Sequence, residues 1–418
     1  MEKCENLFEM ALSFNYMFLG FDLTEEQKLI QAAVREFAEK ELTPDKSREY
    51  EEKHEFPWGL YRKACQHGFL SLHFPEEFGG QGYGLMEHFI CLYEAAKIDP
   101  PLADTIIMSA HFGVELIIKF GNHEQKAKWL PSLSEGEITM SSMFTEPSGG
   151  SDLTRPLETR ATKINNTDWK INGTKTFVTN GEIFTVANVL AQTNMEAKPP
   201  YRGQTLFLVK KGPNVDTTPI HGKMGWQMSP TSEVTFRDVM VTDEDVLGGP
   251  ENLNKGLYLT LQWLPITRTK IGCYSIAASE AALQTAIKYS KEREAFGRKI
   301  GGFQGLAHRI VDLATEVELG KSLLFRTIKV LEKAQVDRSL MDEAAKLASM
   351  VKYYGAALSV KACDLAIDVL GGYGYLAEYN VERWFRWAKK NDIVEGTKEI
   401  QKNTIARQLL GKELTKYF

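Results

Sequence analysis

Glu395 stands near the C-terminus between a valine and a glycine, in the stretch NDIVEGTKEIQKNTIARQLLG. A carboxylate held away from water can serve as a general base, because desolvation raises its pKa toward the range in which it accepts a proton at neutral pH. The residue also has a purely structural explanation, since Thr397 is a candidate N-cap and negative charge before a helix is favoured by the helix dipole. Taken alone, the stretch favours the structural explanation.

The loop SSMFTEPSGGSDL (141–153) places Gly149, Gly150 and Ser151 in a row. Consecutive backbone N–H groups and a hydroxyl can hold an anion such as a phosphate without a lysine or an arginine. A glycine-rich hinge between two domains explains the same residues, and composition alone favours the hinge.

The segment GTKTFVTNG (173–181) ends a predicted strand in which Phe177 and Thr179 share one face. An aromatic ring and a hydroxyl on one face suit a flat polar ring, which can stack on the first and hydrogen-bond to the second. A cross-strand packing pair is the alternative, and it would be favoured if this segment stood alone.

A basic and aromatic cluster lies in KEREAFGRKIGGFQGL (291–306), where Arg293 stands near Phe296 and Gln304. Such a cluster fits a nucleotide diphosphate, although solvated charge at a helix end is the commoner cause. In LGGYGYL (370–376) the glycines follow a helical pattern and no strand, so they indicate a tight turn between helices and no dinucleotide-binding fold. The sequence has no P-loop, HExxH, GxSxG or zinc-ligand spacing, and we expect no metal.

The elements that must position these residues fall into three parts. Helical periodicity runs through 22–136, short β-branched segments broken by Asn, Gly and Pro fill 137–248, and long helical patterns return in 249–418. We therefore predict a mainly α protein with a β insert: an N-terminal helical domain, a middle β-barrel-like domain and a C-terminal four-helix domain. Residues 1–21 are predicted to be a separate N-terminal arm.

Composition sets limits on partners and compartment. The 418 residues are 43% apolar and 25% charged, with a formal charge of −5, which gives no general electrostatic reason to expect nucleic acid or an anionic membrane as partner. No apolar run is long enough to span a membrane, and the N-terminus fits neither a signal peptide nor a transit peptide. Five widely spaced cysteines indicate free thiols in a reducing compartment, so a cytoplasmic protein is expected.

Together these stretches are far more specific than any one of them. The chain resembles the acyl-CoA dehydrogenase family from about residue 22 onward, through ordered segments that read LTEEQKLI, FPEEFGGQGYG, MFTEPSGGSDL, GTKTFVTNG, SPTSEVTFRDVMV, REAFGRKIGGFQGL, LGGYGYLAEYNVERWFR and EGTKEIQKNTIARQLLG. The resemblance implies FAD as cofactor, bound between the middle and C-terminal domains, with a neighbouring subunit of a homotetramer contributing.

The resemblance also implies roles for individual residues. Around FAD it places Met143, Thr145, Gly150, Ser151, Phe177, Thr179, Thr397 and Glu399. Arg293, Phe296, Gln304 and the turn at Gly371 and Gly372 are expected to reach the adenosine diphosphate half of FAD in the neighbouring subunit. The substrate thioester is expected beside Ser151, Arg268, Val394 and Gly396.

By the same resemblance Glu395 becomes the catalytic base. It would take the α-proton of an acyl-CoA thioester while flavin N5 takes the β-hydrogen as hydride, giving a trans-2-enoyl-CoA and passing electrons to electron-transfer flavoprotein. Hydrogen bonds to the thioester oxygen, from the Glu395 backbone N–H and the flavin ribityl chain, would stabilise the enolate that develops. Some family members carry the base just before the arginine that aligns with Arg268, and Thr267 stands there instead, which leaves Glu395 as the candidate.

Departures from the family pattern bear on the substrate. Val394 stands where tyrosine is usual, which widens the acyl pocket, so we expect a branched, cyclic or aryl-bearing acyl group. Two alternatives stay open at this point: an oxygen-using flavoenzyme of the same fold, either an acyl-CoA oxidase or a monooxygenase, and a non-catalytic family member. Chain length and Glu395 favour the dehydrogenase over the oxygen-using enzymes.

Overall fold

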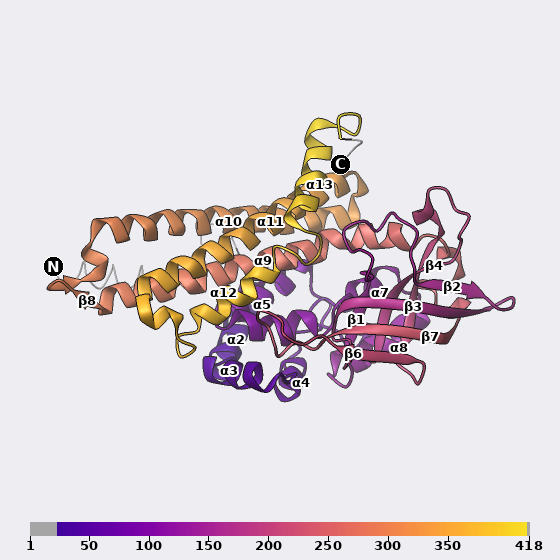
Figure 1. The fold of residues 1–418 in the computed structure, drawn as a ribbon, viewed down its shortest axis with the longest axis horizontal. Helices are drawn as coiled ribbons and strands as arrows, with labels where there is room; N and C mark the ends of the chain where they lie inside the picture. The colour runs from indigo at the N-terminus through magenta and orange to yellow at the C-terminus, as the bar shows by residue number, and fades with distance from the viewer. Residues whose placement is uncertain (1–22, 416–418) are drawn as a thin grey trace.

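The computed structural model describes residues 23–415 and has a helical part, a β part and a second helical part in chain order (Figure 1). The predicted fold class is confirmed. The N-terminal helices are α2 (Glu25–Glu41), α3 (Pro44–Lys53), α4 (Trp58–Gln66), α5 (Leu85–Ala96), α6 (Pro100–Ala103), α7 (Val114–Phe120) and α8 (His123–Ser134). Between α6 and α7 runs the π-helical segment η2 (Asp104–Ser109), and such segments are frequent at functional sites.

The middle part is a curled sheet, seven-stranded within the described residues, with the order β1-β4-β2-β3-β7-β6 and with β5 paired to β4. Its strands are β1 (Met140–Met143), β2 (Arg160–Lys163), β3 (Asp168–Thr179), β4 (Val186–Gln192), β5 (Gln204–Lys210), β6 (Val215–Pro219) and β7 (Thr231–Thr242). Strands β2 and β3 form an antiparallel hairpin, whereas β1 pairs with β4 in parallel. The register of β3 against β7 shifts between Lys175 and Val178, at the end that carries Phe177.

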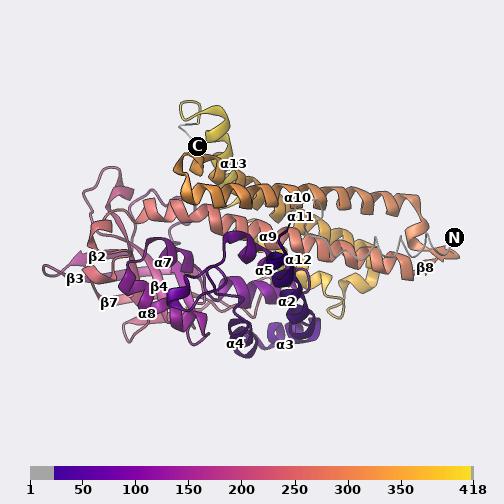
Figure 2. The same ribbon diagram turned by 180° about the vertical axis from the view of Figure 1, so that it is seen from behind.

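The C-terminal part is a bundle of long helices that runs along the longest axis of the molecule, with the sheet at one end of that axis (Figures 1 and 2). Its elements are α9 (Gly256–Glu292), the short hairpin of β8 (Glu294–Ala295) and β9 (Arg298–Lys299), α10 (Gln304–Val336), α11 (Met341–Leu370), α12 (Val381–Lys390) and α13 (Lys398–Leu410). The N-terminal helices pack along one side of the bundle, where α5 contacts α9, and α9 in turn packs against α11 (Figure 1).

Local signals in the sequence explain several helix ends. Thr24 and Gln27 form a capping box at the start of α2, and the Thr397 hydroxyl accepts the N–H of Ile400 as N-cap of α13, as predicted. Gly121 ends α7, and the turn at 371–375 follows α11 directly. These caps fix where the loops between helices begin.

The apolar core is continuous from the N-terminal helices into α9 and α11, and a second cluster fills the sheet. The described cysteines are all buried and free, namely Cys65, Cys91, Cys273 and Cys363. Cys4 and the predicted N-terminal arm lie outside the described residues. Within residues 23–415, no helix combines the length and the apolar character that a membrane crossing requires.

Candidate active site

A cavity of about 360 Å³ lies where the sheet meets the loop between α12 and α13. It brings together most of the residues that the sequence singled out, although they are far apart in the chain. From the middle part it is lined by Met143, Thr145, Gly150, Ser151, Phe177 and Thr179. From the α12–α13 loop it is lined by Val394, Glu395, Gly396 and Thr397.

The sheet side of the cavity is shaped by the irregular end of β3. Phe177 has a left-handed φ of 54° beside the register shift; the residue is 69% exposed and lines the cavity. An aromatic residue adopts this conformation only when its surroundings hold it there, and such positions cluster at binding sites. A Cβ added at Gly150 would lie 3.1 Å from the Thr145 methyl carbon, so a larger residue there would have to displace the Thr145 side chain by a few tenths of an ångström.

Opposite this wall, Glu395 and Gly396 both have left-handed φ values, 58° and 87°. Their carbonyl oxygens are tied down from the helices behind. Gln401 donates its side-chain amide to both carbonyls, at 3.0 and 2.7 Å, and the Lys352 ammonium donates to the Gly396 carbonyl at 2.8 Å. The loop is therefore held in a strained shape that directs the Glu395 side chain into the cavity.

The Glu395 carboxyl is enclosed by protein but reaches the cavity surface, and burial raises its pKa to about 7. The Arg268 guanidinium, the Lys352 ammonium and the Thr267 hydroxyl act in the opposite direction, while the negative charge of Glu115 adds to the rise. A carboxyl with a pKa of this size is close to half ionised at neutral pH. It is therefore suited to accept a proton from a weakly acidic group.

The backbone N–H of Glu395 has no acceptor among the hydrogen bonds of the described residues. Because buried N–H groups are nearly always paired, this donor is available to a ligand beside the carboxylate. A carbonyl oxygen placed there would sit next to the base and to a fixed hydrogen-bond donor.

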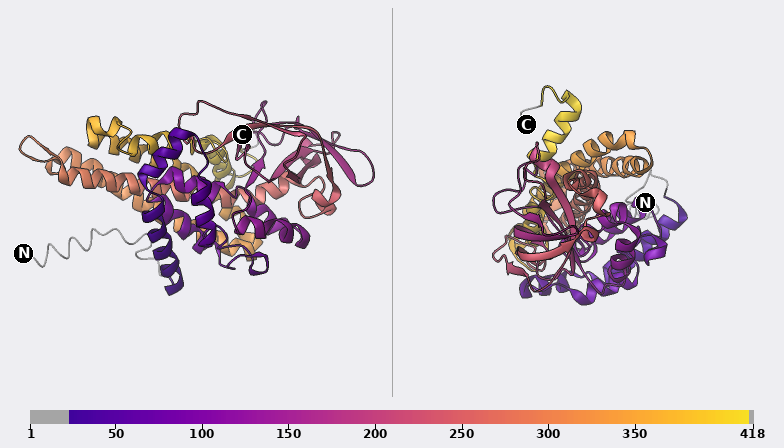
Figure 3. Two further views of the ribbon diagram at one scale, coloured as in Figure 1. Left: turned by 90° about the horizontal axis from the view of Figure 1, so that it is seen from below. Right: turned by 90° about the vertical axis from the view of Figure 1, so that its right-hand side faces the viewer.

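A second group of predicted residues gathers elsewhere. Arg293, Gly371 and Gly372 line a separate cavity of about 390 Å³ beside the β8–β9 hairpin, at the opposite end of the bundle from the sheet (Figures 1 and 3). Phe296 is 95% exposed at the tip of this hairpin, and Gln304 is exposed at the start of α10. One chain therefore does not bring these residues to the Glu395 cavity.

Besides Phe296 and Gln304, two further expected site residues line neither of these cavities. Arg268 lies behind the loop, where its Nε donates to the Glu395 carbonyl at 3.3 Å and burial lowers its pKa to about 10. Glu399 is exposed in the first turn of α13. Their proposed contacts with thioester and FAD stay predictions.

Other residues of the Glu395 cavity were missed by sequence reasoning. Trp226, Ile271, Tyr274 and Lys390 line its helical side. The sequence offered one signal for Lys390, the second lysine of RWAKKND, because this lysine stands at the end of a helical pattern beside apolar residues. Nothing local linked that lysine to Asp104, with which it forms a buried ion pair at 2.8 Å.

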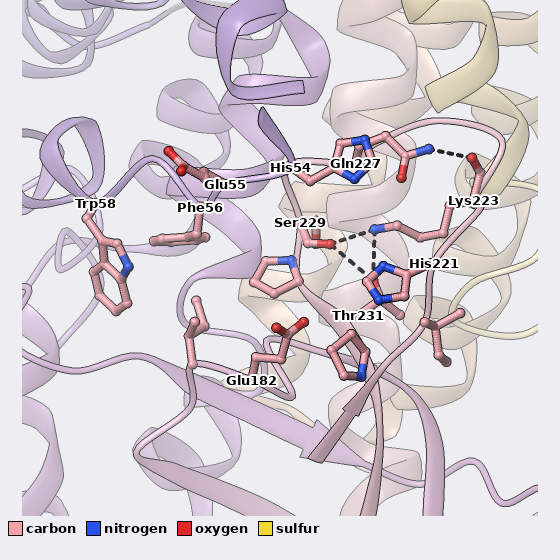
Figure 4. Close-up of a pocket in the computed structure, with 14 residues that line it drawn as sticks. His54, Glu55, Phe56, Trp58, Glu182, His221, Lys223, Gln227, Ser229 and Thr231 are labelled. Atoms are coloured by element: carbon pink, nitrogen blue, oxygen red, sulfur yellow. Dashed lines mark hydrogen bonds between the residues drawn. The ribbon is translucent and has the colours of Figure 1, made fainter. Parts of the chain in front are cut away.

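A further cavity, of about 280 Å³, lies between the N-terminal helices and the sheet and is lined by Trp58, Glu182 and His221 among others (Figure 4). Its ammonium group, Lys223, donates to the carbonyls of Trp226 and Ser229 and to the Thr231 hydroxyl. All three of its N–H groups are thus used inside the protein, which leaves no free cation to bind a ligand.

One group of side chains has metal-ligand types within 4.8 Å of one another: His73, His88 and Glu115. Both Glu115 oxygens are already engaged, one by the Lys270 ammonium and one by the Trp263 indole N–H at 3.1 Å. A dication beside this ammonium is electrostatically unfavourable. The arrangement supports the expectation of no metal, which stays a prediction.

Sequence models of the acyl-CoA dehydrogenase N-terminal, middle and C-terminal domains match residues 24–137, 141–239 and 254–410. The chain belongs to the acyl-CoA dehydrogenase family. It is 33% identical to an acyl-CoA dehydrogenase of Bacillus subtilis, over 93% of this chain and 99% of that protein. It is 34% identical to the caffeyl-CoA reductase-Etf complex subunit CarC of Acetobacterium woodii, again over 93% and 99%.

Solved structures agree with this assignment. A structure described as the electron transferring flavoprotein of Acidaminococcus fermentans matches with a TM-score of 0.86 and 32% identity, over 93% of this chain and 99% of that one. A glutaryl-CoA dehydrogenase from Mycobacterium smegmatis in complex with FADH2 matches with a TM-score of 0.83 and 25% identity, over 96% and 97%. This acyl-CoA dehydrogenase is accordingly an FAD-dependent oxidoreductase.

The Glu395 cavity fits a flavin ring on its sheet side. Phe177 offers an exposed aromatic face, Thr145 and Thr179 offer hydroxyls, and Gly150 leaves the loop close to Thr145 without a side chain in the way. These are the properties that a flat ring with polar edges requires.

Proposed function

We propose that this acyl-CoA dehydrogenase removes the α-proton and the β-hydrogen of an acyl-CoA thioester, giving the trans-2-enoyl-CoA. When bound, FAD supplies the oxidising chemistry, accepting the β-hydrogen with its electron pair. The protein's part is to hold the thioester between Phe177 and Glu395 and to take the α-proton. The observation that carries this proposal is the raised pKa of a carboxyl that faces the flavin-compatible wall of one cavity.

Glu395 acts as the base. The α-proton of a thioester is too weakly acidic for a carboxylate with an ordinary pKa of about 4.3. A carboxylate with a pKa of about 7 narrows that gap, and exclusion of water by the ligand narrows it further. Thr267 occupies the alternative position for the base and has no carboxylate, so the described cavity contains Glu395 without a competing one.

The free N–H of Glu395 stabilises the thioester oxygen. As the α-proton leaves, negative charge builds up on that oxygen, and a fixed donor at this position lowers the energy of the transition state. Arg268 and Lys352 bind the loop carbonyls on the side away from the cavity, which fixes the position of this N–H donor relative to the carboxylate.

A second copy of the chain completes the cofactor site. Arg293, Phe296, Gln304 and the glycines at 371–372 lie at the opposite end of the bundle from Glu395, so the adenosine diphosphate half of FAD meets them only if another subunit presents them. This separation and the family resemblance support a homotetramer with shared FAD sites.

Electron-transfer flavoprotein is the proposed electron acceptor. The CarC relative is a subunit of a complex with that flavoprotein. One of the structural matches is described as an electron transferring flavoprotein. Rapid peroxide formation in air would instead favour an oxygen-using enzyme such as an acyl-CoA oxidase or a monooxygenase. A protein that purifies without FAD and cannot be reconstituted with it would favour a non-catalytic member.

The test is anaerobic bleaching of the FAD absorbance band with a panel of acyl-CoA thioesters. Wild-type protein is expected to bleach with at least one of them, and Glu395→Gln is expected to retain FAD and bind the same thioester without bleaching. Glu413→Gln, an exposed carboxylate near the C-terminus, is the matched control and should bleach at the wild-type rate. Wild-type bleaching by Glu395→Gln would remove Glu395 from this role.

A further inference from the structure

The helical side of the Glu395 cavity carries an ammonium group that the proposed reaction does not use. Lys390 closes α12 and lines the cavity, with 18% of its side chain exposed. Its Nζ lies 2.8 Å from Asp104 and 2.9 Å from the Asn391 side-chain oxygen. An ammonium has three N–H donors, and no third acceptor lies within hydrogen-bonding distance among the described residues.

The protein builds a rigid aromatic wall around this ammonium. Nζ lies 4.2 Å from the Trp226 ring centroid, 5.2 Å from that of Trp387 and 5.4 Å from that of Tyr274. Trp226 has a left-handed φ of 61°, and its indole N–H is fixed by the Thr105 hydroxyl at 2.8 Å. A tryptophan in this conformation is held there by its surroundings, which marks the wall as preorganised.

Asp104 is satisfied on the side away from the cavity. It is fully buried and accepts from Ser109, at 2.8 Å, and from the Trp387 indole, at 2.9 Å, besides its pairing with Lys390. The carboxylate therefore anchors the ammonium from behind and neutralises its charge. What the cavity meets is a donor without a net positive charge.

A second donor lies in the same wall. The Tyr274 side chain is buried and lines the cavity, and its hydroxyl has no hydrogen-bond partner in the described structure. Buried hydroxyls are nearly always paired, so an unpaired one that borders a cavity indicates a group that arrives with the ligand.

We infer that Lys390 and Tyr274 form a subsite for the far end of the acyl group, which carries an uncharged oxygen such as a hydroxyl, phenol or carbonyl oxygen. This inference rests on the proposed function, because it assumes that the thioester lies at Glu395. Val394, Ile271 and Trp226 line the same cavity as the two donors, and we place the acyl group along these three residues, between Glu395 and the donors. A second carboxylate fits poorly, because Asp104 already balances the positive charge of Lys390.

The test is calorimetric binding of matched acyl-CoA pairs to the FAD-loaded Glu395→Gln protein, which holds substrates without turnover. The first pair is 3-phenylpropionyl-CoA with its 4-hydroxyphenyl analogue, and the second is hexanoyl-CoA with 6-hydroxyhexanoyl-CoA. At least one hydroxylated member is expected to bind about tenfold tighter than its partner, the effect of one or two added hydrogen bonds to a charged or hydroxyl donor. Equal affinities within both pairs would overturn the inference.

Variants separate the subsite from the rest of the site. Each variant is made in the Glu395→Gln protein. Lys390→Met is expected to reduce the affinity preference for the hydroxylated thioester over its partner to less than about twofold, and Tyr274→Phe is expected to reduce that preference in part. Lys389→Met, an exposed neighbour on the same helix, should leave it unchanged. If Lys390→Met does not fold because Asp104 loses its partner, the double variant Lys390→Met with Asp104→Asn replaces it, and Tyr274→Phe remains an independent measure.

Two further ligands distinguish a wrong ligand class at the subsite from a wrong proposed function. Tighter binding of 3-(4-carboxyphenyl)propionyl-CoA than of the hydroxyphenyl thioester would show an anionic acyl group and contradict the uncharged class. Butyryl-CoA reports on the proposed function itself. If neither it nor any other thioester binds or bleaches wild-type FAD, the proposed function fails, whereas binding without discrimination makes only the subsite wrong.

Discussion

The Nε of Arg268 and the carbonyl oxygen of Glu395 lie 3.3 Å apart, so a buried cation on α9 supports the loop that carries the proposed base. The same guanidinium is the largest of the influences that lower the pKa of the Glu395 carboxyl against the effect of burial. One side chain thus contributes both to the position of the proposed base and to its pKa.

Arg268→Gln is expected to raise the pKa of Glu395 above its value of about 7, because the main opposing positive charge is gone. The rate of anaerobic FAD bleaching should then rise with pH over a higher range than in the wild type, since the base must be ionised to act. Arg407→Gln, which removes an exposed charge from α13, serves as control. An unshifted pH profile in a correctly folded Arg268→Gln protein would show that this charge does not tune the base.

Much of this site could be predicted from the sequence, because its parts are local motifs. The Thr397 cap and the β2–β3 hairpin depend on short stretches whose backbone preferences are strong, whereas the grouping of Phe177 with Thr145 was expected from the family resemblance. The pairing of Lys390 with Asp104 could not be predicted, because it joins residues that are far apart in the chain and meet only after the N-terminal helices pack on α12. Nor does composition reveal a left-handed φ at Trp226, which tertiary packing imposes.

Glu395→Gln is expected to change the pH dependence of stability. The carboxyl has a folded-state pKa of about 7 and an ordinary value of 4.5, so the native state binds the extra proton between these values. Stability that this group contributes is present below about pH 4.5 and is lost as the pH rises through about 7. Glutamine cannot ionise, so the variant should match the wild type near pH 5 and be more stable at pH 8.

The expected gain at pH 8 is on the order of 2 kcal/mol, since the partial exposure of the carboxyl to the cavity reduces the full effect of the pKa shift. Thermal unfolding of FAD-loaded protein at both pH values measures it. Glu413→Gln should change the stability equally at pH 5 and pH 8, because that carboxylate is exposed. A Glu395→Gln gain that is equal at pH 5 and pH 8 would contradict the raised pKa.

Val394→Tyr is expected to narrow the acyl side of the cavity. The valine lines the cavity immediately before Glu395, and a tyrosine ring there would occupy space beside the reacting carbons. The ratio of kcat/KM for a cyclic or aryl-bearing acyl-CoA to that for butyryl-CoA should fall about tenfold or more, the usual scale of steric discrimination in an apolar pocket. Val394→Leu is the conservative control. If Val394→Tyr keeps the wild-type ratio, the valine does not set the width of the pocket.

Phe296→Ala is expected to separate cofactor binding from the stability of the subunit. The ring is 95% exposed at the tip of the β8–β9 hairpin, so its removal from an isolated chain should leave thermal unfolding of the apoprotein almost unchanged. If a second copy uses this ring to hold the adenosine diphosphate half of FAD, the affinity for FAD should fall about tenfold or more. FAD titration followed by fluorescence gives the affinity, and sedimentation gives the assembly state.

Val336→Ala, at the other end of α10 and 91% exposed, is the matched control. Equal FAD affinity for both variants would place the adenosine half away from this hairpin and would remove the reason for sharing the site between subunits.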